Sequence, residues 1–80
     1  KLLKLTVDVG EEGPRTLVAG IADQYKAEDL PGRRIVVLIN LKPAKIRGII
    51  SNGMLLAAEV GEDVGLLTID KELDAGAKVL

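Results

Sequence analysis

The sequence predicts an all-β fold of about five to six short antiparallel strands with one short helix, closed or nearly closed into a small barrel. Its apolar runs have the length and composition of strands, and clusters of Gly, Pro, Asn and Asp separate them at short intervals. Neither an internal repeat nor a linker interrupts the chain, so we expect residues 1–80 to form one domain. An SH3-like barrel or a small sandwich would give a similar pattern.

The first predicted element is a β-hairpin formed by residues 3–9 and 15–21. Apolar and polar residues alternate in the first segment, which is typical of a half-buried strand. The intervening residues 10–14 contain glycines, which tolerate positive φ, and a proline, which fixes its own φ. The residues predicted to face the core are Leu3, Leu5, Val7 and Val9.

The middle of the chain is predicted to hold one helical turn and then a central strand. Residues 24–30 can form the helical turn, which Pro31 and Gly32 would end. Residues 33–40 contain the most β-branched run of the chain and are predicted to form a central strand with both faces largely covered. Pro43 cannot donate to a strand ladder, so this strand must end or bend just before it.

The second half of the chain is predicted to continue as short strands joined by turns. Residues 45–50 can return as a strand with Lys45, Arg47 and Ile49 on one face. Residues 51–53 are predicted to form a tight turn, because Asn-Gly is the strongest short hairpin signal. The remaining predicted strands are residues 54–60, 64–69 and 77–80.

The composition argues against several classes of function. Without Cys the chain has no disulfide, zinc knuckle or thiol nucleophile, and without His it lacks the usual transition-metal ligand and general base. Nucleotide-binding glycine motifs are absent, and the remaining catalytic candidate is a carboxylate pair such as Glu59 and Asp63. We therefore expect no enzyme activity, no cofactor, no metal and no small-molecule substrate. The chain has neither a long apolar run nor a signal-peptide pattern, which fits a cytoplasmic location.

Charge is distributed unevenly along a chain whose net charge is −1. The 21 residues from Arg33 to Gly53 contain no carboxylate, although the chain has 12 acids. This segment is net +5 and the remainder net −6, and its cations are Arg33, Arg34, Lys42, Lys45 and Arg47. The pattern indicates a local positive field, so we expect the excursion around residues 42–47 to bind an anion. The alternative is a solvated loop that is basic by chance.

Residues 40–58 carry a recognisable motif. It reads N-L-K-P-x-K-I-x-G over residues 40–48 and S-x-G-M-L-x-A-A over residues 51–58. Supporting matches are K-L-L-K-L at residues 1–5, R-T-L-V-A-G-I-A at residues 15–22 and A-G-A-K-V at residues 75–79. Nearly the whole chain thus resembles the tRNA-binding OB-fold family. That family includes the C-terminal appendix of methionyl-tRNA synthetases, free-standing dimeric tRNA-binding proteins and part of an endothelial-monocyte-activating polypeptide.

The resemblance implies an OB-fold barrel that binds the outer corner of tRNA by shape, with little sequence readout. It also implies either a tRNA-recruiting appendix of an aminoacyl-tRNA synthetase or a free-standing tRNA-binding protein. The residue types suit this function, because duplex RNA is recognised mainly through phosphates and 2′-hydroxyls. OB-folds that bind single strands rely on stacked aromatic side chains, whereas Tyr25 is the only aromatic residue here and lies outside the basic segment.

The resemblance also implies the RNA-binding residues. They are Lys42, Lys45 and Arg47 for phosphates, Ser51 and Asn52 as hydrogen-bonding groups, and Met54 as an apolar contact, with Asn40 beside them. Lys1 and Lys4 lie on the polar face of the first predicted hairpin and could extend this surface. Each set has a structural alternative: turn chemistry for residues 51–53, a core position for Met54, a strand-end cap for Asn40, and solvated strand ends for Arg33 and Arg34.

Two departures from the family pattern stand out. Family members are longer at the N-terminus, so the resemblance implies that one strand of a five-stranded barrel is missing from these 80 residues. Either the chain is a fragment, or another copy, another chain or a rearranged terminus fills the gap. The second departure is Asn52, where many relatives have Gln or Glu. Because an incomplete barrel exposes a strand edge, the alternative function is a protein-association module, most simply a symmetric homodimer.

Overall fold

Eight short strands and two single turns of 3₁₀ helix make up the computed structural model, which covers residues 1–80. The strands are β1 (Leu3–Asp8), β2 (Pro14–Ala19), β3 (Val37–Leu38), β4 (Ala44–Ile46), β5 (Ile49–Ser51), β6 (Met54–Leu55), β7 (Ala57–Val60) and β8 (Asp63–Leu66). The helical turns are η1 (Gly10–Glu12) and η2 (Ala27–Asp29). The predicted all-β class is confirmed. None of the helices is long and apolar enough to cross a membrane.

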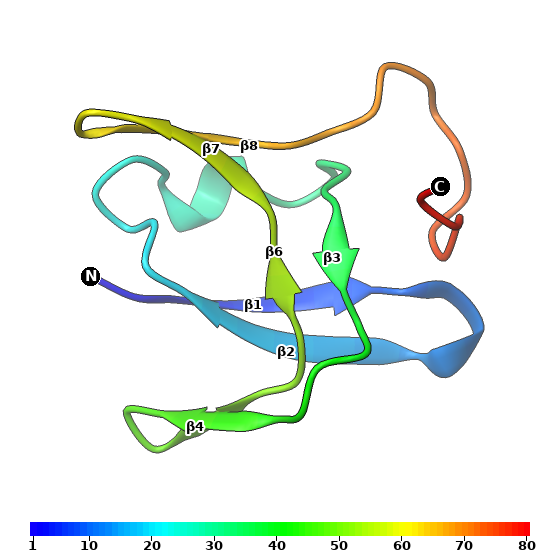
Figure 1. The fold of residues 1–80 in the computed structure, drawn as a ribbon, viewed down its shortest axis with the longest axis horizontal. Coiled ribbons are helices and arrows are strands. Elements are labelled where there is room, and N and C mark those ends of the chain that lie inside the picture. Colours follow the sequence, from blue (N-terminus) through cyan, green and yellow to red (C-terminus); the bar gives the residue numbers. More distant parts are fainter.

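The strands pair into four separate two-stranded antiparallel sheets, β1–β2, β3–β6, β4–β5 and β7–β8. The predicted closed barrel is not found, because no strand has a hydrogen-bonded strand on both of its edges. Figure 1 shows β3 and β6 crossing over β1 and β2, with the β7–β8 pair along the top of the view and β4 along the bottom. The OB-fold assignment therefore stays a prediction.

The first predicted hairpin is confirmed. The pairing of β1 with β2 runs from Leu3 opposite Ala19 to Asp8 opposite Pro14. Burial alternates along β1, with the three predicted apolar positions half-buried and the residues between them exposed. Val9 is also half-buried, but it lies beyond the end of β1 and precedes η1. The alternation of the sequence thus fixes which face of β1 meets the core.

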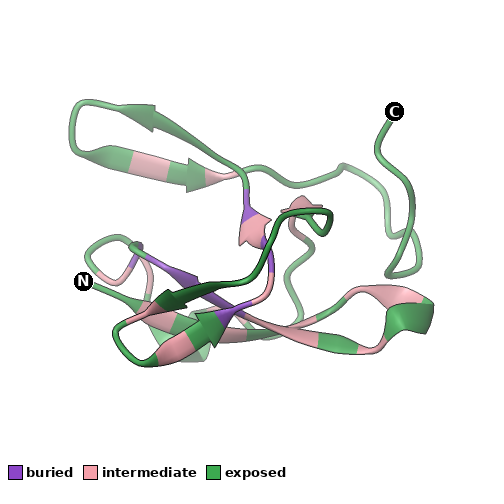
Figure 2. Ribbon diagram, turned by 60° about the horizontal axis from the view of Figure 1, so that its bottom comes forward, coloured by how far each residue is buried: buried purple, intermediate pink, exposed green.

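Strand β2 is the centre of a small core. Only seven of the 80 residues are buried, and Leu17, Val18 and Ala19 of β2 are three of them. Figure 2 shows the buried residues on β2 and on the chain that leads into β6. Leu17 and Ala19 pack with Ile21 and Leu55, and half-buried side chains of β1, β3 and β8 surround this cluster. With so small a core, each buried contact carries a large share of the stability.

The prediction of a central strand over residues 33–40 is wrong. Only Val37–Leu38 form a strand, and β3 pairs with β6 alone. Leu38 and Ile39 are exposed by 37% and 39%. A β-branched run indicates a preference for extended backbone, but it does not determine which strand the tertiary structure places at the centre.

Other boundaries also differ from the prediction. The predicted helical turn over residues 24–30 is present as the shorter η2. Residues 54–60 divide into β6 and the fully exposed β7, and the last predicted strand, residues 77–80, is irregular and exposed. Leu56 lies at the division: its N–H donates to the Val36 carbonyl at 3.0 Å, next to the β3–β6 pair, and its carbonyl accepts the Leu67 N–H at 3.1 Å, next to the β7–β8 pair.

Candidate nucleic-acid interface

Three predicted phosphate-binding cations lie on or beside the hairpin formed by β4 and β5. Lys42 precedes β4, Lys45 lies within it and Arg47 begins the turn to β5. Strand β4 is hydrogen-bonded only to β5, and β5 contacts β2 on the inner side. The three cations are exposed and are distributed along β4 and its two ends. The three residues of β4 span roughly 10 Å, at about 3.3 Å of extended chain per residue.

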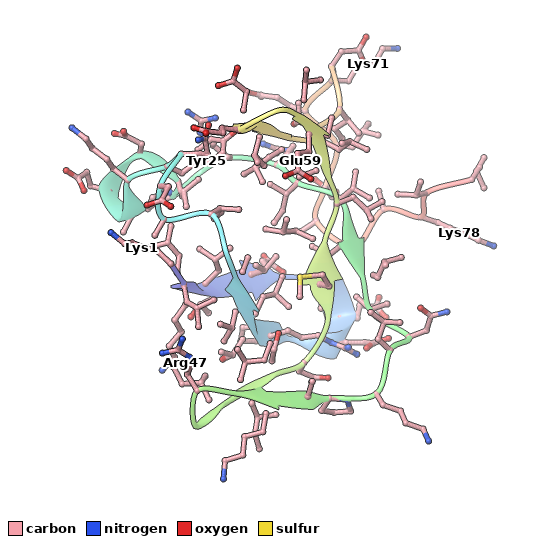
Figure 3. All side chains as sticks on the ribbon, turned by 60° about the vertical axis from the view of Figure 1, so that its left-hand side comes forward. Lys1, Tyr25, Arg47, Glu59, Lys71 and Lys78 are labelled. Carbon is pink, nitrogen blue, oxygen red and sulfur yellow. The ribbon has the colours of Figure 1, made fainter.

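The turn of this hairpin is at Arg47–Gly48 and not at residues 51–53, as the Asn-Gly signal had predicted. Arg47 and Gly48 have φ values of 51° and 81°, as a two-residue type I′ turn requires. Arg47 is the only non-glycine residue with positive φ, a conformation that costs about 1 kcal/mol. Figure 3 shows Arg47 at the end of the hairpin, on the same side of the view as Lys1. The strained backbone conformation therefore occurs at the same residue that carries the exposed charge, Arg47.

The turn position also corrects the predicted faces of the hairpin. Lys45 pairs across the hairpin with Ile50, and Ile46 pairs with Ile49. Ile46 and Ile49 are half-buried, whereas Ile50 is 60% exposed on the outward face with Lys45. The prediction that Ile49 shares a face with Lys45 and Arg47 is wrong, because residues 45–50 are not one continuous strand. The structure thus adds Ile50, an apolar side chain beside a cation, to the candidate surface.

Residues 51–53 anchor the hairpin to the core instead of forming its turn. Ser51 is only 3% exposed, and its hydroxyl accepts the Val18 N–H at 3.0 Å and donates to the Gly53 carbonyl at 3.0 Å. The half-buried Asn52 donates its main-chain N–H to the Thr16 carbonyl at 2.7 Å. These bonds join the chain to the edge of β2 that β1 leaves free. The Ser51 hydroxyl is therefore buried and hydrogen-bonded within the chain, in a strand and not in the turn that the structural alternative had assumed.

Gly53 provides a close backbone approach. It is buried with a φ of 128°, and a Cβ at this position would lie 2.8 Å from the Leu38 carbonyl oxygen and 3.1 Å from a methyl carbon of Leu17. A side chain would therefore collide with β3 and with the core. The glycine of the Asn-Gly pair is needed for packing and not for a hairpin turn.

The other predicted site residues lie outside the β4–β5 hairpin. Lys1 pairs with Asp23 at 3.9 Å, and Lys4 is exposed on the polar face of β1. Met54 lies in β6 opposite Leu38. Its half-buried side chain is neither a core residue nor fully accessible to a ligand. Asn40 is exposed, and its side chain makes no hydrogen bond within the chain, so the predicted strand-end cap is absent.

None of the cations on the β4–β5 hairpin takes part in an ion pair. The chain contains two, Lys1 with Asp23 and Arg15 with Glu12, so neither involves a cation of the β4–β5 hairpin. No group of three or more acidic side chains comes together in a way that could hold a metal ion. The positive charge of the hairpin cations is therefore not neutralised by a carboxylate of the chain.

Arg15 is a positioning residue that the sequence did not reveal. Its side chain is 16% exposed, contacts the Glu12 carboxylate and donates to the Ile39 carbonyl at 2.8 Å. This bond holds the main chain immediately before Asn40, the first residue of the motif that spans residues 40–58. No local pattern could have identified the contact, because it joins residues 24 positions apart.

The remaining two cations of the acid-free segment, Arg33 and Arg34, are separate from the hairpin. They lie between η2 and β3, toward the end of the molecule in Figure 1 that is opposite β4. They are not strand ends, because β3 begins only at Val37, and both donate to main-chain carbonyls. The acid-free segment therefore forms two basic regions and not one.

Comparisons with known proteins identify the family of the chain. Residues 1–78 match the family model described as "Putative tRNA binding domain". The methionine–tRNA ligases of Methanocaldococcus jannaschii and Thermotoga maritima are 56% and 57% identical to the chain over 80 and 79 residues. Both matches cover 99% of the chain but only 12% of the ligase. The chain thus spans about one eighth of these curated relatives.

Solved structures give the same family. A chaperone CsaA from Bacillus anthracis superimposes with a TM-score of 0.94 at 34% identity, covering 99% of this chain and 76% of that protein. A MetRS-related protein from Pyrococcus horikoshii superimposes with a TM-score of 0.89 at 44% identity, covering 100% and 73%. From the family match over nearly its whole length and from these relatives, the chain belongs to the tRNA-binding domain family.

Proposed function

We propose that this domain binds the double-helical outer corner of tRNA by shape, through the phosphates that reach Lys42, Lys45 and Arg47. The observation that carries the proposal is the placement of these cations on and beside β4, exposed and without an ion-pair partner. The rest of the chain is net negative, so the positive field is confined to few places. A protein of this kind binds RNA locally without binding polyanions over its whole surface.

Duplex recognition fits the chain better than single-strand recognition. Single-strand binding requires aromatic faces on which bases can stack. Tyr25 is the only aromatic residue, its hydroxyl accepts the Leu66 N–H at 3.0 Å, and the Arg33 guanidinium lies 5.6 Å from the centre of its ring. Because Tyr25 lies outside the hairpin and no other aromatic side chain exists, phosphates and 2′-hydroxyls are the groups that the hairpin can contact.

The proposed contact surface differs from the one that the sequence implied. It keeps the three hairpin cations with Asn40, adds Ile50 beside Lys45, and omits the buried Ser51. The exposed Lys4, together with Lys1, Asn52 and Met54, forms its outer part. Ile50 would pack against a ribose, so that the surface offers an apolar contact between phosphate contacts.

We further propose that the domain recruits tRNA to an aminoacyl-tRNA synthetase or acts as a free-standing tRNA-binding protein, and that it is not itself catalytic. The relatives named methionine–tRNA ligase support the first arrangement, since the chain aligns with a small part of each. The solved relatives support the second, since the chain covers about three quarters of each. In both arrangements the domain supplies affinity for tRNA and takes no part in a chemical reaction.

Fluorescence anisotropy of labelled tRNA, measured from low to physiological salt, tests the proposal. We expect affinity to fall steeply with salt, with a log–log slope of roughly −2 to −4 for a few phosphate contacts. The triple substitution Lys42→Ala, Lys45→Ala, Arg47→Ala should abolish binding while the circular dichroism spectrum is unchanged. An unstructured RNA of equal length should compete poorly.

A charge-matched triple variant separates the hairpin from net charge. Lys26, Lys71 and Lys78 are exposed, take part in no ion pair, and lie outside the hairpin. Replacing these three by Ala changes the net charge by the same amount and should alter tRNA affinity less than about twofold. Normal tRNA binding by the hairpin variant, or equal losses in both variants, would show that the hairpin is not the interface.

A second candidate function is self-association, as a homodimer. Each two-stranded sheet leaves strand edges unpaired, and large apolar residues remain exposed, among them Val60 (79%), Leu73 (49%) and Val79 (66%). Sedimentation velocity at several concentrations decides this, because a dimer must dissociate on dilution. A monomer mass at every concentration would rule it out and leave tRNA binding unaffected.

A further inference from the structure

Arg33 and Arg34 line a shallow hollow that the proposed tRNA interface does not include. Its volume is about 220 Å³, and its walls are Arg33, Arg34, Ile35, Leu66 and Thr68. It lies where the segment before β3 meets the end of β8, and no residue of the β4–β5 hairpin lines it. The hollow therefore combines two cations and a hydroxyl with an apolar floor, apart from the basic hairpin.

Both guanidinium groups are held in place by main-chain carbonyls. The Arg33 Nε donates to the Asp29 carbonyl at 3.1 Å, and the Arg34 Nε donates to the Leu73 carbonyl at 2.8 Å. Neither arginine takes part in an ion pair. Their Nη groups have no hydrogen-bond partner in the chain, so each fork presents free donors that no carboxylate neutralises.

Tyr25 adds a further constraint on one side of the hollow. The Arg33 guanidinium lies 5.6 Å from the centre of the Tyr25 ring, and the Tyr25 hydroxyl accepts the N–H of Leu66, which lines the floor. The cation–π contact and the carbonyl bond both restrict the Arg33 side chain. Because less side-chain freedom is lost on binding, such a tethered fork binds an anion more strongly than a mobile one.

We propose that Arg33, Arg34 and the Thr68 hydroxyl form a second oxyanion-binding site, and that its ligand is a phosphate group. Two guanidinium forks and a hydroxyl offer more donors than the two oxygens of a carboxylate can use, whereas a phosphate presents three or more acceptor oxygens. The phosphate is either a backbone phosphate of an RNA bound elsewhere on the domain or that of a free phosphate compound.

Titration with inorganic phosphate tests the site in the unmodified domain. Nε–Hε signals of arginine and the Thr68 amide signal are followed by ¹H–¹⁵N NMR, with sodium chloride at matched ionic strength as reference. We expect saturable shifts at Arg33, Arg34 and Thr68 that chloride does not reproduce. Shifts that match those in chloride, or equal shifts at cations all over the surface, would overturn the proposal.

Substitutions then assign the binding. Arg33→Gln with Arg34→Gln should weaken phosphate binding roughly tenfold or more, because hydrogen bonds to a charged group are lost. Arg33→Lys with Arg34→Lys keeps the charge but loses the forks, so we expect an intermediate loss. The control is Lys71→Gln with Lys78→Gln, two cations that point away from the molecule in Figure 3. A control that weakens binding as much as the arginine pair would show an effect of net charge alone and contradict the site.

Adding tRNA to the phosphate-loaded domain, with the same NMR signals followed, distinguishes the two possible sources of the phosphate. If tRNA moves the signals of Arg33 and Arg34 to a second bound position that no longer depends on the phosphate concentration, the site holds an RNA phosphate, and if the signals stay unchanged, it holds a free one. Both results support the site. If tRNA does not bind at all, the proposed function fails, but the phosphate titration remains readable because it does not depend on tRNA. The wild-type titration also stands if the Gln variants do not fold.

Discussion

The outer turn at Arg47–Gly48 and the junction at residues 51–53 are three residues apart, yet they differ in burial, in hydrogen bonding and in the space around their glycines. The turn is exposed, has open space around Gly48 and carries an unpaired charge on Arg47. The junction is tied to β2 by the Ser51 hydroxyl and the Asn52 N–H, and Gly53 has no space for a side chain. One motif therefore combines residues that hold the fold with residues that are free to meet a ligand.

This difference shows that a shared sequence signature does not by itself identify contact residues. Ser51 and Arg47 both belong to the motif, but burial gives the first a structural position and exposure gives the second a surface position. Substitutions at the junction should therefore act on folding, and substitutions at the turn should act on binding. Three variants test this division.

The largest effect is expected for Gly53→Ala. A Cβ 2.8 Å from the Leu38 carbonyl oxygen, on a residue with a φ of 128°, should lower the free energy of unfolding by about 3 kcal/mol. Gly48→Ala is the matched control: its φ is also positive, at 81°, but no atom lies within 4 Å, so about 1 kcal/mol is expected. Urea denaturation measures both, and equal losses would contradict the close approach at Gly53.

A smaller loss is expected for Ser51→Ala. The substitution leaves the Val18 N–H without its partner in a buried position, which should cost about 1–3 kcal/mol of stability. Thr6→Ala, on the exposed face of β1, should change stability by less than about 0.5 kcal/mol. The folded Ser51 variant should bind tRNA normally. A variant of unchanged stability and much weaker tRNA binding would instead make Ser51 a contact residue.

The smallest change in stability, with the opposite sign, is expected for Arg47→Asn. Asn-Gly is the preferred pair for a type I′ turn, so the variant should gain about 0.5–1 kcal/mol. Its tRNA affinity should fall, and the magnitude of its salt slope should decrease by about one, because one phosphate contact is lost. Arg47→Lys keeps both the charge and the strain and should resemble the wild type. A variant that loses stability would show that Arg47 does more than display a charge.

Local patterns predicted part of the fold correctly. The alternation in residues 3–8 gave the buried face of β1, and the glycines and proline after it gave the first hairpin. The β-branched run before Asn40 gave extended backbone but not its position, since Leu38 and Ile39 are exposed and β2 is central. Position in a sheet depends on which strands meet, and a short run contains no information about its partners.

The candidate site divides in the same way. The absence of acids from Arg33 to Gly53 is visible in the sequence, and it indicated that positive charge would gather. It did not show that the cations would occupy two regions, with Arg33 and Arg34 at one end and the hairpin cations at the other. Distance along the chain is a poor measure of distance in space once the chain turns back on itself.

By itself, the sequence determined the all-β class, the first hairpin, the uneven charge and the family of this protein. Only the tertiary structure decided which of two glycine-containing dipeptides turns the hairpin and whether Ser51 faces the core or the solvent. The physical reason is that the free edge of β2 needs partners for the Val18 N–H and the Thr16 carbonyl. Residues more than 30 positions further along the chain provide them.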